Sequence, residues 1–277
     1  MPTFSAPDGT RLAYRVTGEG TPLVCFPGGP TDAGYLGDLG GLSAHHRLIL
    51  LDPRGTGGSA VPEDTSSYRS DRQVEDIEAL RTHLGLPAMD LLAHSAGTNT
   101  AIQYAARHPD RLRRLALIGP STRAVGIPVP GGTRRDLARL RAHEPWFAAA
   151  FGALEALTEG TGTDADAAAV APFFHGRWDA AARRHHEASR PANQEAVALF
   201  GAGDAFTPHA TRAALAAFPS PALLLTGEYD LNSPPQPTAE IAALFPRATL
   251  AVQAGAGHHP WIDDPARFTA EVAAFLA

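Results

Sequence analysis

Short apolar runs separated by stretches of helical periodicity dominate the first part of the chain. A turn at Asp8 and Gly9 opens a predicted hairpin whose second strand covers residues 12–16. Further apolar runs follow at residues 23–26, 48–51, 90–93 and 115–118. Apart from Asp90, each of these runs is continuously apolar rather than alternating, which is typical of parallel strands that are covered on both faces. We therefore expect them to form the centre of a parallel sheet.

Helical patterns lie between several of these runs. Residues 72–84 carry apolar side chains at steps of three and four, which predicts an amphipathic helix. A second helix is predicted over 98–107, ending before Pro109. Strands and helices that alternate in this way favour an α/β fold, with helices on both faces of a mostly parallel sheet.

The alternation of predicted strands and helices stops after residue 120. Residues 121–218 contain helical segments and no convincing strand. Strand patterns return at 222–225 and 248–252, and helical patterns at 238–244 and 265–276. Ligands bind at the carboxyl ends of the strands in open α/β sheets, and a helical insertion is expected to cover those ends. We predict a core domain from residues 1–120 and 219–277, with a helical cap at 121–218 inserted after the sixth strand.

Composition narrows the classes of function. The 277 residues carry a net charge of -6 without a basic patch, so a nucleic-acid partner has no electrostatic support. No apolar run reaches the roughly 20 residues that span a bilayer, which argues against a membrane partner. The amino terminus shows neither the basic nor the apolar region of a signal peptide, so we expect a cytoplasmic protein.

Several kinds of chemistry are also disfavoured. All 23 basic residues are arginines, which excludes a lysine Schiff base and a Walker A loop. Cys25 is the only cysteine, so a disulfide within the chain is impossible, and its apolar surroundings predict burial. His175, His185 and His186 fall in the predicted cap, where histidines on a helix surface are commoner than ligands. No metal or other cofactor is predicted.

A serine follows the apolar run 90–93. The segment Ala93-His94-Ser95-Ala96-Gly97 has the G-x-S-x-G pattern of a nucleophile elbow, with alanine in the first place. Small residues are needed there because the strained turn that lifts the serine hydroxyl brings neighbouring backbones close together. Ser95 is therefore the candidate nucleophile.

A glycine turn after the run 23–26 supplies a candidate oxyanion hole. In this arrangement one backbone N–H comes from the turn and one from the residue after the serine. Pro27 and Pro30 have no N–H to donate. Gly29, or in second place Gly28, is then the donor from the turn, and Ala96 is the donor beside Ser95.

Candidates for the acid and the base follow the last two strands. Asp230 comes just after the run 222–225, and its rival Glu228 is expected to point the other way. His258 and His259 lie on a glycine-rich loop after the run 248–252, and spacing alone leaves both open. An acid that hydrogen-bonds a histidine fixes its tautomer, as in a serine hydrolase triad.

Three motifs carry a resemblance to a known family. Residues 27–31 resemble an HGGPG turn, residues 52–59 match DxRGxGxS, and residues 255–261 match GxGHxPW. The chain thus resembles the α/β-hydrolase superfamily and, within it, the proline iminopeptidase-like branch. The resemblance selects His258 over His259 as the base and implies an α/β-hydrolase fold with the triad Ser95, Asp230 and His258.

Three differences from the motifs of that branch mean that the resemblance does not identify the substrate. Pro27 and Thr31 replace its histidine and glycine, and Ala96 stands where true proline iminopeptidases usually have tryptophan. We expect an acyl-enzyme mechanism on a small-molecule or short-peptide substrate. One possibility is an aminopeptidase, a second is an esterase, lactonase or thioesterase for a small or secondary metabolite, and a third is a non-catalytic ligand-binding protein. Phe174 and Trp178 are candidates to line the substrate pocket, and the oligomeric state is open.

Overall fold

In the computed structural model, which describes residues 1–188 and 192–277, a single sheet of eight strands forms the centre of the molecule. The strands are β1 (Thr3–Ser5), β2 (Arg11–Thr17), β3 (Pro22–Phe26), β4 (Arg47–Asp52), β5 (Met89–His94), β6 (Leu112–Ile118), β7 (Ala222–Gly227) and β8 (Ala248–Gln253). Their order across the sheet is β1-β2-β4-β3-β5-β6-β7-β8. β2 pairs antiparallel with β1 and β4, and every other pair is parallel. The predicted α/β class is confirmed.

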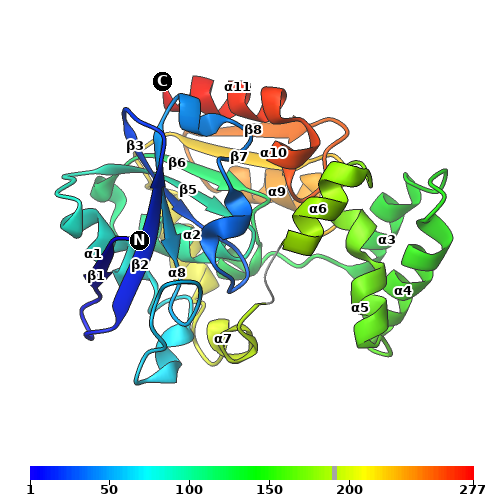
Figure 1. Cartoon of the computed structure of the whole chain (residues 1–277), viewed down its shortest axis with the longest axis horizontal. Helices are drawn as coiled ribbons and strands as arrows, with labels where there is room; N and C mark the ends of the chain where they lie inside the picture. Colours follow the sequence, from blue (N-terminus) through cyan, green and yellow to red (C-terminus); the bar gives the residue numbers. More distant parts are fainter. Residues whose placement is uncertain (189–191) are drawn as a thin grey trace.

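Helices surround this sheet and fill the long connection between β6 and β7 (Figure 1). The α-helices are α1 (Val74–His83), α2 (Gly97–Arg107), α3 (Gly131–Arg139), α4 (Phe147–Glu159), α5 (Asp164–Ala169), α6 (Ala180–Ala188), α7 (Gln194–Phe200), α8 (Pro208–Leu215), α9 (Pro235–Ala242), α10 (Pro260–Asp263) and α11 (Pro265–Leu276). Short 3-10 helices include η1 (Ala33–Leu36) and η6 (Ala171–Phe174). None of the described helices is long and apolar enough to cross a bilayer.

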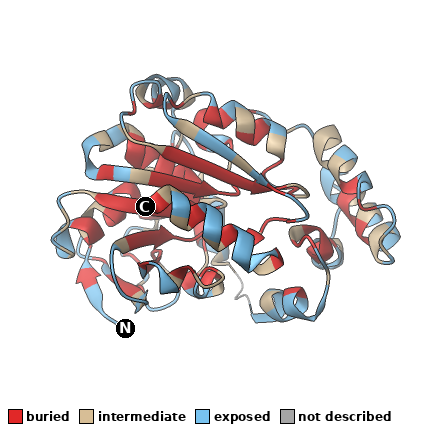
Figure 2. Ribbon diagram, turned by 90° about the horizontal axis from the view of Figure 1, so that it is seen from above, coloured by how far each residue is buried: buried red, intermediate tan, exposed pale blue. Residues whose placement is uncertain are grey.

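The continuous apolar runs are explained by burial on both faces of the sheet. In β5, Leu91 and Ala93 pack with α1, α2 and α9, while Leu92 packs on the opposite face with α11. Successive side chains of a strand point to opposite faces, so a strand covered on both sides needs an apolar residue at every position. The central strands are accordingly buried along their length (Figure 2).

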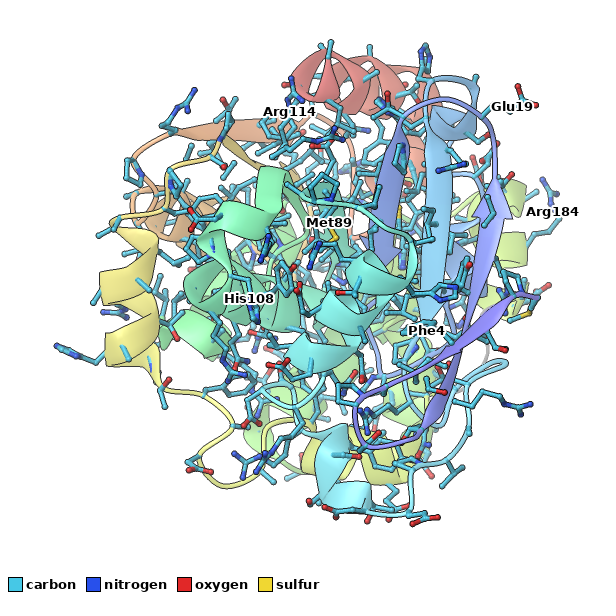
Figure 3. The ribbon with its side chains drawn as sticks, turned by 90° about the vertical axis from the view of Figure 1, so that its left-hand side faces the viewer. Phe4, Glu19, Met89, His108, Arg114 and Arg184 are labelled. Atoms are coloured by element: carbon cyan, nitrogen blue, oxygen red, sulfur yellow. The ribbon has the colours of Figure 1, made fainter. Side chains whose placement is uncertain are left out.

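Charged side chains, in contrast, lie at the surface of the molecule. Met89 begins β5 and is buried, whereas Glu19 and Arg184 extend into solvent at the outside of the molecule (Figure 3). Cys25 is fully buried in β3, and burial raises the pKa of its thiol, so it is an apolar core residue as predicted.

The helices between β6 and β7, α3 to α8, will be called the insertion. Part of it has an apolar cluster of its own, in which Ala150, Leu154 and Phe173 pack with Leu231 of the segment after β7. Helices α3, α4 and α5 stand to one side of the sheet, and α6 lies between them and the sheet (Figure 1). The insertion therefore meets the sheet at the end where β5, β7 and β8 release their following loops.

Candidate active site

Ser95 lies in the turn between β5 and α2. Its φ of 52° is a left-handed conformation that costs a non-glycine residue roughly 1–2 kcal/mol. Its N–H donates to the carbonyl of Ile118 at 2.9 Å, which ties the turn to β6. Small neighbours are required, because a Cβ added at Gly97 would collide with the carbonyl oxygen of Pro27, and one added at Gly28 would lie 2.7 Å from Cβ of Ser95.

Two hydrogen bonds connect Ser95 to a buried carboxylate through a histidine. Nε2 of His258 is 2.8 Å from Oγ of Ser95, and Nδ1 of His258 is 2.8 Å from Oδ2 of Asp230. The other oxygen of Asp230 accepts the N–H groups of Asn232 and Ser233 at 2.9 and 3.0 Å. These two amides fix the carboxylate, so the imidazole has one orientation, with Nδ1–H toward Asp230.

The two alternative candidates, Glu228 and His259, make other contacts. Glu228 accepts the N–H of Gly255 at 2.8 Å on a loop away from the serine. His259 directs Nδ1 to the carbonyl of Phe174 at 3.3 Å, and it makes no hydrogen bond to Ser95. The structure thus brings Asp230 and His258, rather than Glu228 and His259, to the serine.

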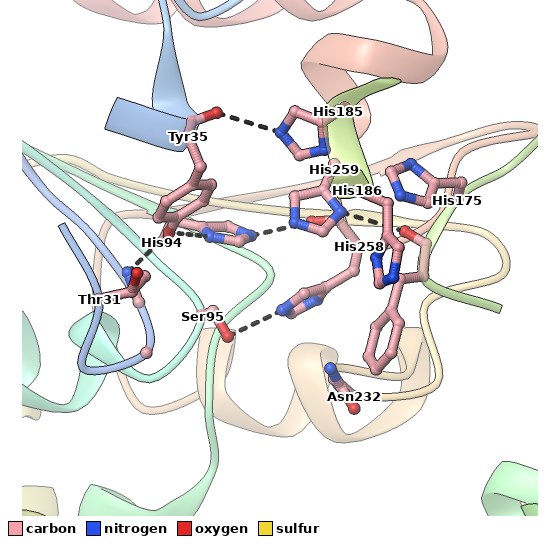
Figure 4. Close-up of a pocket in the computed structure, with 13 residues that line it drawn as sticks. Thr31, Tyr35, His94, Ser95, His175, His185, His186, Asn232, His258 and His259 are labelled. Atoms are coloured by element: carbon pink, nitrogen blue, oxygen red, sulfur yellow. Dashed lines mark hydrogen bonds between the residues drawn. The ribbon is translucent and has the colours of Figure 1, made fainter. Parts of the chain in front are cut away.

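A cavity of about 270 Å³ opens beside Ser95 (Figure 4). It is lined by Gly28, Gly29, Thr31, Tyr35, His94, Ser95, Phe174, His175, His185, His186, Asn232, His258 and His259. The lining combines glycine backbone, aromatic rings and imidazoles, and no carboxylate side chain occurs among its described residues. The cavity therefore suits a small molecule without a cationic group better than one that carries such a group.

The glycine turn lies against Ser95, since a Cβ added at Gly28 would be 3.3 Å from its Oγ. The N–H of Gly28 donates to the hydroxyl of Tyr35 at 2.7 Å, so Gly29 remains the candidate donor from the turn. Ala96 is the first residue before α2, where backbone N–H groups have no partner within the helix. Gly29 and Ala96 thus occupy the places expected of the two oxyanion donors.

Tyr35 and His94 join the glycine turn to the loop of His258. The Tyr35 hydroxyl accepts from Gly28 and is 2.7 Å from Nδ1 of His94, while Nε2 of His94 is 2.9 Å from the carbonyl oxygen of His258. Burial lowers the pKa of His94 well below its ordinary value, so the ring is neutral. The hydroxyl therefore donates to Nδ1, and Nε2–H donates to the carbonyl.

The contacts of His94 in this network are long-range. Its partners are 59 and 164 residues away along the chain, so no periodicity in the sequence indicates them. Tyr35, which follows the glycine turn within η1, was not singled out from the sequence for the same reason.

Phe174 connects the insertion to the loop of His258. The carbonyl of Phe174 accepts the N–H of His258 at 2.8 Å, and the residue also lines the cavity. Trp178 is not among the lining residues; it packs on the rings of His175 and His186, with centroids 5.6 and 5.8 Å away. Phe174 therefore contacts the cavity directly, and Trp178 supports its wall.

Three histidines gather on that wall. Ring atoms of His175, His185 and His259 that could serve as metal ligands lie within 4.8 Å of one another. The expectation of surface histidines is wrong for His175, which is fully buried, and burial next to His185 and His186 lowers its pKa to about 3. The sequence could not indicate this group, because His259 follows β8 while the other two belong to the insertion.

Asp52 and Arg54 have a structural role in the loop after β4. Asp52 accepts the N–H groups of Ala33 and Gly58 at 2.9 and 3.0 Å. Arg54 makes two hydrogen bonds of 2.6 Å to Asp76 of α1. Neither side chain lines the cavity beside Ser95.

Comparison with known proteins supports the same fold. A family model described as the alpha/beta hydrolase fold matches residues 21–265. An esterase from Thermogutta terrifontis superimposes with a TM-score of 0.73 at 25% identity, covering 99% of this chain and 97% of that one.

Two curated relatives differ in how much of the chain they match. The proline iminopeptidase of Heyndrickxia coagulans is 34% identical over 116 residues, which covers 40% of this chain and 40% of that protein. The N-formylmaleamate deformylase of Pseudomonas putida is 30% identical over 272 residues, which covers 97% of this chain and 94% of the relative. Similarity to the iminopeptidase is therefore partial, and similarity to the deformylase spans nearly the whole of both chains.

Proposed function

The chain belongs to the α/β-hydrolase family, and from that premise we propose that it is a serine hydrolase with Ser95 as its nucleophile. His258 is the general base, and Asp230 holds it in the tautomer that accepts a proton at Nε2. The observation that carries this proposal is the pair of 2.8 Å hydrogen bonds from Ser95 through His258 to Asp230.

The reaction proceeds by acyl transfer. Oγ of Ser95 bonds to a carbonyl carbon while its proton passes to Nε2 of His258, and the carbonyl oxygen takes up the negative charge. The N–H groups of Gly29 and Ala96 donate to that oxygen. The imidazolium then protonates the leaving group, which departs and leaves an acyl ester on Ser95. Water attacks this ester as His258 takes its proton, and the proton returns to Ser95 when the acid product leaves.

The favoured substrate is a small ester, lactone, thioester or amide. Within residues 1–188 and 192–277, no carboxylate lines the cavity to bind the free ammonium group of a peptide. Its volume of about 270 Å³ also lies at the small end of ligand sites, which run from about 300 to 1,000 Å³. The nearly full-length similarity to a deformylase of N-formylmaleamate supports this class.

Removal of amino-terminal residues from peptides is the second candidate. It is supported by the proline iminopeptidase-like motifs and by the partial match to the iminopeptidase of Heyndrickxia coagulans. It requires an acidic side chain from outside the residues that line the cavity.

Initial rates on two kinds of substrate test both candidates. We expect wild type to hydrolyse p-nitrophenyl acetate and butyrate, and Ser95→Ala to lower kcat by roughly 10⁴-fold or more. Ser66→Ala, at an exposed position, is the matched control and should retain the rate. Turnover of proline or alanine p-nitroanilide with a free amino group would favour the second candidate. Absence of both turnover and fluorophosphonate labelling at Ser95 would leave a ligand-binding protein.

A further inference from the structure

Three imidazoles from separate segments meet at one wall of the cavity (Figure 4). His175 follows η6, His185 belongs to α6, and His259 precedes α10. The centroids of their rings are 4.6, 5.0 and 5.5 Å apart. Zinc–nitrogen bonds of about 2.0–2.1 Å at tetrahedral angles place imidazole centroids about 5 Å apart. The rings therefore have about the spacing of three ligands of one ion, and their ligand atoms, which lie within 4.8 Å of one another, must approach to about 3.3 Å when the ion binds.

His175 supplies an independent observation. It is fully buried, and both of its ring nitrogens lack a hydrogen-bond partner among the described residues. A buried polar group without a partner destabilises the fold unless something else satisfies it. Because its ring packs on those of His185 and His259, an ion bound between the three would provide that partner.

The other two rings are oriented by backbone carbonyls. Nε2 of His185 is 3.1 Å from the carbonyl oxygen of Tyr35, and Nδ1 of His259 is 3.3 Å from that of Phe174. When one imidazole nitrogen donates to a carbonyl, the lone pair is fixed on the other nitrogen. Histidines that ligate metals almost always have such an outer partner, which sets the tautomer and the direction of the ring.

We propose that His175, His185 and His259 form a binding site for a divalent ion of the zinc class. Imidazole nitrogen suits zinc, cobalt, nickel and copper, whereas magnesium and calcium prefer oxygen. Three protein ligands leave one tetrahedral position for water on the side of the cavity. Since His185 and His175 belong to the insertion and His259 follows His258, the ion fastens the insertion to the loop of the proposed base. The proposal stands whether or not Ser95 is a nucleophile.

Metal titration of the untagged, chelator-treated full-length chain tests the site. We expect one zinc ion per chain by calorimetry, a visible absorption band typical of tetrahedral cobalt, and a rise in Tm of about 5 °C at zinc 100-fold above Kd. His185→Ala and His259→Gln should each weaken zinc binding by roughly 100-fold and abolish the rise in Tm. His186→Ala, one residue away on α6, is the matched control and should bind zinc as wild type does.

Three results would overturn the proposal. The first is that wild type binds neither zinc nor cobalt. The second is that binding survives unchanged in His185→Ala and His259→Gln while circular dichroism shows both variants folded. The third is that His186→Ala weakens binding as much as they do. Equal Tm values of the metal-free wild type and His185→Ala separate loss of a ligand from loss of the fold.

Discussion

The sheet and the insertion contribute to the site in different ways. From the sheet come three side chains, Ser95, Asp230 and His258, each placed just after a strand and held by hydrogen bonds to backbone groups. From the insertion come the carbonyl of Phe174 and a wall of aromatic and imidazole rings. The proposed chemistry therefore depends on the sheet, and the shape of the cavity depends on the insertion.

Packing explains the difference. The strands lie between two extensive apolar clusters, one on each face, whereas the cluster of the insertion is small and lies between short helices. A site built on buried strands is held more precisely than one built on short helices and loops. Substitutions in the sheet should thus change kcat for every substrate, and substitutions in the insertion should change KM for some substrates.

The largest effect is expected from the acid. Asp230→Asn should lower kcat by roughly 10⁴-fold on all substrates, because the neutral amide no longer stabilises the imidazolium or its tautomer. Glu228→Gln is the matched control, since Glu228 bonds Gly255 instead, and it should leave kcat within about 2-fold. Steady-state kinetics on two substrates gives both values. A larger loss in Glu228→Gln would contradict the assignment.

The second prediction concerns a substitution that lowers the stability of the fold without changing the cavity. Arg54 and Asp76 pair at 2.6 Å with side chains 3% and 2% exposed, so Asp76→Ala removes the buried partner of Arg54 and leaves the exposed Asp8 as its remaining carboxylate. The free energy of unfolding in urea should fall by about 3 kcal/mol, the low end of the range for breaking a buried pair. Glu75→Ala, at the exposed neighbouring position, should change it by less than about 0.5 kcal/mol. A shift in KM for Asp76→Ala with unchanged stability would show that this pair acts on the site.

Tyr35→Phe should give an intermediate effect. The variant removes the hydroxyl that accepts from Gly28 and donates to His94, so two buried groups lose a partner. We expect kcat to fall by roughly 10-fold, about 1.4 kcal/mol, with KM nearly unchanged. His94→Gln should lower kcat to a similar extent, and the double variant should cost less than the sum of the two. Strictly additive losses would mean that the two residues do not act as one network.

The smallest effect belongs to the insertion. Trp178→Ala removes the support behind His175 and His186 but no residue that lines the cavity. We expect KM to rise about 2- to 5-fold for the larger of two esters, less for the smaller, and kcat to stay the same. Phe151→Ala, which packs on Phe147 elsewhere in the insertion, should leave both KM values unchanged. An equal loss of kcat on both esters would contradict the separate roles assigned to the sheet and the insertion.

The sheet and the insertion also differ in how well the sequence predicts them. The helix predicted over 265–276 has those bounds in the structure, and the strands lie at the predicted runs. Burial on both faces explains the apolar runs of the central strands, whereas β8 at the edge of the sheet exposes Leu250 and Val252. Ser95, Asp230 and His258 could be singled out because each follows such a run. The limits of the core and cap domains, at 120/121 and 218/219, stay a prediction.

Contacts between distant segments leave no such pattern. Tyr35, His94 and the group of His175, His185 and His259 meet only because loops and short helices from different parts of the chain pack together. Their geometry depends on tertiary packing, which periodicity along one segment does not report. Phe174 and Trp178 were both predicted to line the pocket, and tertiary packing also explains why Phe174 does so while Trp178 packs behind the wall.

The pairing of β6 with β7 also has a consequence for how the chain folds. These neighbours are separated by residues 119–221, so the sheet is completed only after the whole insertion has been synthesised. Closing a loop on the order of a hundred residues costs about 2 kcal/mol more entropy than closing one of about ten. Until then β6 is an open edge that can pair with another nascent chain. Because β6 and β7 are parallel, a shortened connection must still be a crossover of at least about a dozen residues. A variant in which such a crossover replaces most of the insertion should fold faster and aggregate less during refolding.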